Sequence, residues 1–117
     1  MASLTIHRGG LDPGHYVWSP FVTKLEARLR FASVPYKTTA GSLKAAPKGK
    51  IPYIEIAEEI GPSSTIGDLT LITKHLVERG TLPDLNASLS PSERAHDLAI
   101  RALLEDKCYF CNVWLWL

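Results

Sequence analysis

The chain has 117 residues, of which 45% are hydrophobic, so it is long enough and apolar enough for a compact domain and is not a disordered chain. Thirteen Lys and Arg residues against twelve Asp and Glu residues give a formal net charge of +1, which argues against nucleic acid or an acidic membrane surface as a partner. The start has no basic and apolar leader, and no apolar run approaches the length that spans a bilayer, so we expect a cytoplasmic protein.

The first predicted elements are a strand and a helix. Leu4–His7 form a short alternating run, and Asp12-Pro13-Gly14 supply turn residues after it. Ser19 is a favoured N-cap residue and Pro20 suits the first helical turn, so a helix is expected to begin there. Ser19 would lie at the positive end of the helix dipole, where its hydroxyl could bond a thiolate, or it could cap the helix and do nothing more. The predicted buried face of this helix follows three-four spacing: Val22, Leu25, Leu29 and Ala32.

The next two strands are predicted around a surface connection. Val34-Pro35 ends the helix, and a second strand, parallel to the first, is expected at residues 36–39. Residues 41–50 read as an exposed connection, after which Pro52 opens a third strand. A cis Ile51-Pro52 bond would turn the Ile51 amide and carbonyl toward a peptide-like ligand, whereas a trans proline would only open the strand.

The remaining elements are a hairpin partner and two helices. A short fourth strand is expected at residues 64–66, and Asp68 is a good N-cap for a helix that Gly80 ends. Ser90-Pro91-Ser92-Glu93 is a full capping box that begins the last helix. Large apolar residues lie on several sides of that helix, so we expect a missing helical domain, an oligomer contact or a sticky tail.

Cys108 and Cys111 have the C-x-x-C spacing of a redox pair. A redox pair of the thioredoxin type lies at a helix start, whereas these two residues fall deep within a helical pattern. We therefore predict buried and chemically quiet cysteines. The four histidines show no paired spacing that would complete a structural zinc site, so no metal is expected.

Three motifs together resemble the N-terminal domain of glutathione S-transferases. They are Ser19-Pro20-Phe21 at a helix start, Pro47-Lys48-Gly49-Lys50-Ile51-Pro52 before a strand, and Gly67-Asp68 at the next helix start. More narrowly, residues 11–16, 90–95 and 102–106 resemble the failed-axon-connections and metaxin-like branch, most closely its fungal members.

The resemblance implies an α/β fold in two parts. Residues 1–82 would form a thioredoxin-like domain with the order βαβ-ββα. Residues 83–117 would form a linker and the first long helix of an incomplete, truncated all-α C-terminal domain.

The resemblance also implies a set of site residues. Ser19 would contact or activate the sulfur of glutathione, and the backbone of Ile51 would pair with the cysteinyl unit beside a cis Pro52. Lys50 matches a position that can approach the glycyl carboxylate. The residues that hold the γ-glutamyl end fall on Asp68 and Leu69, and Leu69 departs from the family's serine because it has no hydroxyl.

The implied function is that of a glutathione transferase with a role in detoxification. Glutathione would be the co-substrate, and its thiol would be conjugated to a small-molecule electrophile. The alternatives are a noncatalytic thioredoxin-fold scaffold for protein interactions, with a homodimer or other association through the apolar C-terminal helix, and a thiol-disulfide oxidoreductase that uses Cys108 and Cys111.

Overall fold

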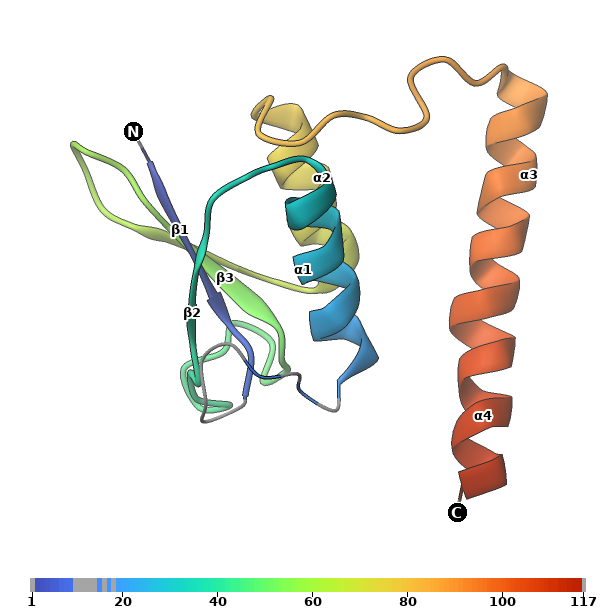
Figure 1. Cartoon of the computed structure of the whole chain (residues 1–117), viewed down its shortest axis with the longest axis horizontal. Coiled ribbons are helices and arrows are strands. Elements are labelled where there is room, and N and C mark those ends of the chain that lie inside the picture. Colours follow the sequence, from blue (N-terminus) through green and yellow to red (C-terminus); the bar gives the residue numbers. More distant parts are fainter. Residues whose placement is uncertain (1, 10–14, 16, 18, 117) are drawn as a thin grey trace. The chain divides into compact units, whose positions relative to one another are not determined.

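The computed structural model describes residues 2–9, 15, 17 and 19–116 (Figure 1). The chain splits into two units, Met1–Pro83 and Asp84–Leu117. The turn predicted at Asp12-Pro13-Gly14 lies outside the described residues, as does most of the 11–16 motif. The elements of the first unit are β1 (Ser3–His7), α1 (Pro20–Phe31), β2 (Lys37–Thr39), β3 (Tyr53–Ala57), β4 (Ser64–Gly67) and α2 (Leu69–Glu78). The predicted βαβ-ββα order is confirmed.

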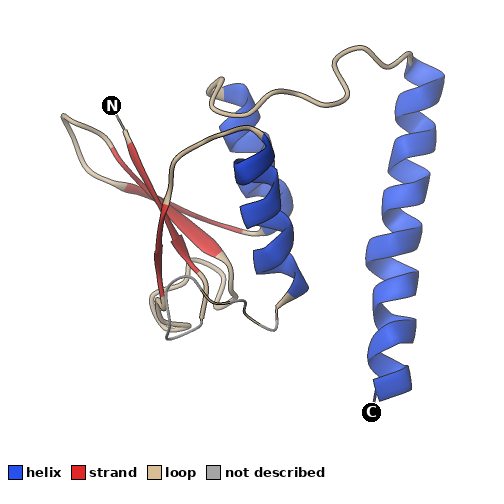
Figure 2. Ribbon diagram, viewed as in Figure 1, coloured by secondary structure: helices blue, strands red, loops and turns tan. Residues whose placement is uncertain are grey.

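The strands form one mixed sheet (Figure 2). Their order in the sheet is β2-β1-β3-β4. Strands β1 and β2 are parallel, whereas β3 runs antiparallel to both β1 and β4. Tyr53 at the start of β3 is paired with His7 at the end of β1 and with Gly67 at the end of β4. The end of β1, the start of β3 and the end of β4 therefore lie together at one edge of the sheet, the edge formed by strand ends and not by an outer strand.

Both helices of the first unit cover the same face of the sheet (Figure 1). Alternate residues of β1 and β3 point toward them, because side chains alternate between the two faces of a strand. The core comprises Leu4, Ile6, Leu25, Leu29, Ile54, Ile56, Ile72, Leu76 and Leu82.

Helix α1 has the predicted buried face, with one addition. Val22, Leu25 and Leu29 are fully buried, as three-four spacing predicted. Glu26 is buried as well, although a carboxylate was not expected on this face. The helix ends at Phe31, and β2 begins at Lys37, close to the predicted boundaries.

The second unit is a short connection followed by a continuous helical segment. It comprises α3 (Pro91–Ala102), a π-helical turn η1 (Leu103–Cys108) and α4 (Tyr109–Trp116). The predicted capping box is confirmed, because the Ser90 N–H donates to Glu93 at 2.7 Å and the Glu93 N–H donates to the Ser90 hydroxyl at 3.2 Å. The wider π-helical turn is not signalled by the sequence pattern.

The prediction of buried cysteines is wrong. Cys108 and Cys111 are both free and exposed. Neither α3 nor η1 has a buried residue, and Trp114 of α4 is 77% exposed. The prediction relied on the apolar residues around the two cysteines. A single helix has no second element of its own unit to pack against, so these apolar neighbours do not bury the thiols. No described helix combines the length and the apolar character that crossing a membrane requires.

Candidate functional site

The register of the sheet gathers five of the six predicted site residues near one edge. Ile51 and Pro52 lie directly ahead of Tyr53, and Asp68 directly follows Gly67, which is paired with Tyr53. A Cβ atom built on Gly9, just beyond β1, would lie 3.5 Å from the Ile51 side chain. The end of β1 therefore adjoins the Ile51-Pro52 segment.

Topology brings the start of α1, and with it Ser19, to the same edge. Because β1 and β2 are parallel, the helix that connects them must run back along the sheet, and it begins on the side where β1 ends. In Figure 1 the start of α1 and the connection between β2 and β3 lie at the same end of the sheet.

Ser19 caps α1 weakly. Its hydroxyl accepts a hydrogen bond from the Val22 N–H at 3.4 Å, and Pro20 occupies the first turn. The helix has twelve residues, no acidic residue in its first turn, and Arg28 and Arg30 in its last. Unpaired amides and the dipole make such a helix start favourable for an anion. The hydroxyl proton of Ser19 is not used by this cap, since the oxygen only accepts.

The Ile51-Pro52 peptide bond is cis, as the resemblance implies. Pro52 is buried and Ile51 is partly buried. Among the described residues, neither the N–H nor the C=O of Ile51 has a backbone hydrogen-bond partner.

Asp68 caps α2 with an unusual backbone. Its φ of 71° and ψ of 119° lie outside the common regions for a residue with a side chain, and such conformations gather at functional sites. Its Oδ1 accepts from the N–H groups of Thr70 and Leu71. The second carboxylate oxygen can therefore accept from a ligand. Leu69 is the first residue of α2 and is partly buried, and Lys50 is exposed.

A comparison with protein families agrees with this geometry. The sequence model described as the glutathione S-transferase N-terminal domain matches residues 20–117. The chain belongs to the glutathione S-transferase N-terminal domain family. The match begins one residue after Ser19, so the predicted thiol-contacting residue stands just outside it. The narrower assignment to the failed-axon-connections and metaxin-like branch stays a prediction.

The donor set at this edge fits the ligand that the family name suggests. Glutathione carries a thiol, a peptide backbone, an ammonium group and two carboxylates. Those groups are complementary to the hydroxyl of Ser19, the carboxylate of Asp68 and the ammonium of Lys50. They also suit the backbone of Ile51, which has no backbone partner among the described residues. In the described part of the chain, no three His, Cys, Asp or Glu side chains gather as metal ligands.

A network of charged and polar side chains lies beside α1, and sequence reasoning missed it. Arg8 lies 3.5 Å from the Glu26 carboxylate, and the Tyr36 hydroxyl donates to Glu26 at 3.0 Å. The Arg30 Nε in turn donates to the Tyr36 hydroxyl at 2.8 Å. The available signal was Glu26 itself, which stands in the apolar stripe of α1 next to Leu25.

Proposed function

We propose that this domain binds glutathione at the sheet edge described above and stabilises its thiolate for attack on a small electrophile. The N–H and C=O of Ile51, which have no backbone hydrogen-bond partner among the described residues, carry the proposal. A peptide ligand laid beside Ile51 would supply a backbone acceptor and donor, the main-chain pairing that commonly binds extended peptides.

The thiol would be held at the start of α1. The Ser19 oxygen accepts from Val22, so its O–H can be donated to a thiolate placed outside the helix. One charge-assisted hydrogen bond contributes about 1.5 to 3 kcal/mol, which corresponds to a thiol pKa lowered by roughly one to two units. The helix dipole acts in the same direction.

The reaction would need no nucleophile from the protein. The glutathione thiolate would attack an electrophilic carbon, so that a carbon–sulfur bond forms and a halide leaves with the electron pair of the broken bond. With an activated alkene, the thiolate would add to one carbon and the other would take a proton from water. The role of the chain is to hold the thiolate and raise its fraction near neutral pH.

The ends of the tripeptide would be held less firmly than its centre. Asp68 would accept from the γ-glutamyl ammonium group, and Lys50 would approach the glycyl carboxylate. Leu69 offers a backbone amide at the start of α2 but no hydroxyl. Because one neutral hydrogen bond is worth about 1 kcal/mol, we expect glutathione binding that is weak but measurable.

Substitutions at Ser19 separate a thiol-activating role from simple helix capping. Ser19→Asp keeps a favoured N-cap but places a negative charge beside the thiolate, whereas Ser19→Ala removes both hydroxyl functions. We expect both variants to raise the thiol pKa of bound glutathione. The ultraviolet absorbance of the thiolate measures this pKa. The Ser92→Ala variant, which changes an exposed serine of α3, is the matched control.

The outcome of the Ser19 experiment is decisive in either direction. If Ser19→Asp restores the thiol pKa of the parent protein, Ser19 acts only as a cap. If calorimetry at millimolar glutathione detects no binding to the parent chain, the proposed function is wrong.

The exposed apolar surface of the second unit favours a second candidate, a scaffold for protein contacts. Trp114 is 77% exposed and Leu115 is 86% exposed, which is unusual for large apolar side chains in water. In sedimentation experiments, the parent chain would associate with rising concentration, and the double variant Trp114→Ser with Leu115→Ser would not. Persistent monomers of the parent chain would exclude self-association by this surface.

We also propose a cytoplasmic location. Cys108 and Cys111 are free and exposed, and exposed thiols stay reduced in a reducing compartment. The thiols are alkylated in the cell, and the isolated protein is then analysed by mass spectrometry. We expect both cysteines to be alkylated, whereas two cysteines without the alkyl group would indicate an oxidising compartment.

A further inference from the structure

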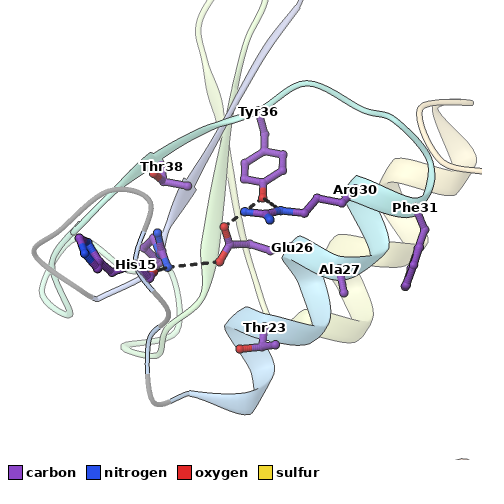
Figure 3. A pocket seen from close by; sticks show the side chains of 9 residues that line it. His15, Thr23, Glu26, Ala27, Arg30, Phe31, Tyr36 and Thr38 are labelled. Carbon is purple, nitrogen blue, oxygen red and sulfur yellow. Dashed lines mark hydrogen bonds and ion pairs between the residues drawn. The ribbon is translucent and has the colours of Figure 1, made fainter.

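A pocket of about 540 Å³ lies beside α1, between this helix and β2 (Figure 3). Its volume falls within the roughly 300–1,000 Å³ of typical small-molecule sites. Arg8, Glu26, Arg30 and Tyr36 supply polar lining, and Ala27 supplies an apolar part. Glu26, Arg30 and Tyr36 point toward one another in Figure 3.

The most buried of these groups is an arginine whose charge is only partly compensated. Arg8 is 5% exposed, and its Nη2 lies 3.5 Å from Glu26 Oε2 and also donates to the backbone oxygen of His15. A charge-assisted pair is usually closer, at about 2.7 to 2.9 Å. Arg8 Nε is buried and has no hydrogen-bond partner among the described residues. A buried guanidinium in this state calls for a further acceptor.

Among the described residues that line the pocket, the guanidinium groups outnumber the carboxylates. Arg8 and Arg30 each carry a positive charge, and Glu26 carries the negative charge between them. The Tyr36 hydroxyl connects the two sides, because it donates to Glu26 and accepts from Arg30 Nε. Guanidinium groups present several N–H donors in a plane, which suits the two oxygens of a carboxylate or a phosphate.

We propose that this pocket binds a small organic molecule that carries a carboxylate or phosphate group. The anionic group would bond the guanidinium groups of Arg8 and Arg30, and the organic part would lie over the α1 backbone at Ala27. None of the six residues predicted for glutathione lines this pocket. The inference therefore stands apart from the proposed function.

Amide chemical-shift mapping of the full chain tests the proposal with three probes of similar size. Benzoate, phenyl phosphate and the uncharged benzyl alcohol are titrated separately to about 10 mM, a range that covers millimolar dissociation constants. We expect saturable shifts at Ala27, Tyr36 and Thr38 with one or both anions and none with benzyl alcohol. Comparison of the two anions distinguishes a carboxylate ligand from a phosphate ligand.

Two charge-removing variants provide the decisive comparison. Arg30→Gln changes an exposed residue, so we expect the fold to be retained, and it should weaken anion binding by about tenfold or more. Lys74→Gln removes one exposed positive charge from α2 and should leave the affinity unchanged. Equal weakening by both variants, shifts centred on Ser19 and Asp68, or the absence of saturable shifts would each overturn the proposal.

Discussion

Arg8, which directly follows β1, and Glu26 in the middle of α1 form a buried ion pair with 3.5 Å between Arg8 Nη2 and Glu26 Oε2. Both residues are at most 9% exposed. The pair connects the central strand of the sheet to the helix that covers it. Removal of one partner would leave the other charge buried without compensation. The free-energy cost of that uncompensated charge is larger than the stabilisation that the intact pair provides.

Glu26→Gln should therefore destabilise the domain by about 3 to 5 kcal/mol, because the amide keeps the shape of the carboxylate but not its charge. The free energy of unfolding in urea measures this loss. Glu78→Gln, which changes an exposed residue at the end of α2, is the control and should change stability by less than about 0.5 kcal/mol. Similar urea midpoints for the two variants would contradict the buried-pair interpretation.

Gly41 is predicted to be far less replaceable than Gly49, although both have a positive φ, of 67° and 63°. A Cβ atom on Gly41 would lie 2.5 Å from the Cβ of His7 and 2.9 Å from the hydroxyl of Tyr53, whereas nothing lies within 4 Å of one on Gly49. His7 and Tyr53 are stacked, with ring centroids 4.2 Å apart, so a new methyl group would disturb the sheet edge.

Gly49→Ala should cost about 1 to 2 kcal/mol, the penalty of the left-handed backbone alone. Gly41→Ala should cost a further 1 to 3 kcal/mol or so from overpacking. Thermal and urea unfolding of the two variants measure the difference. Equal losses would mean that the connection between β2 and β3 moves away from His7 without cost.

Glu93 provides a pH-dependent contribution to the start of α3. The backbone N–H of Ser90, and then its side chain, hold the pKa of Glu93 below its ordinary value. Because the folded pKa is the lower one, the contribution is present above the unfolded pKa and is lost as pH falls through the folded value. Carbon chemical shifts of Ser92 and Arg94 should therefore show fraying in acid. Glu93→Gln should remove this pH dependence, and an unchanged titration in that variant would assign the effect to another group.

Leu69→Ser tests the departure from the family pattern and depends on the proposed function. A hydroxyl at the first position of α2 would add a hydrogen bond of about 1 kcal/mol to the γ-glutamyl end, or roughly a fivefold gain in glutathione affinity. Leu71→Ser, two residues further along the same helix, should give no gain. Calorimetry measures both dissociation constants, and a gain for Leu71→Ser alone would place the ligand elsewhere.

Local signals made much of the fold predictable. The Ser90 capping box, the Asp68 cap and the Ser19-Pro20 start each bring together groups a few residues apart, so sequence spacing specifies them. Alternation and turn residues likewise gave the strands in the right order. The candidate site was partly predictable, because its residues lie directly before or at the start of these predicted helices and strands.

Features that depend on distant partners were not predictable. Burial of Glu26 requires Arg8 from another element, and the exposure of Cys108 depends on what packs against its helix. The π-helical turn before Tyr109 changes the hydrogen-bond register without a distinct residue pattern. The cis state of the Ile51-Pro52 bond was implied by family resemblance rather than by spacing.

A glutathione titration of the parent chain, followed by amide chemical shifts, tests the central claim most directly. We predict saturable shifts in the millimolar range at Ile51, Asp68 and Leu69, and at Phe21 and Val22 in the first turn of α1. Shifts confined to other parts of the chain, or no saturable shift, would contradict a glutathione site at this edge of the sheet.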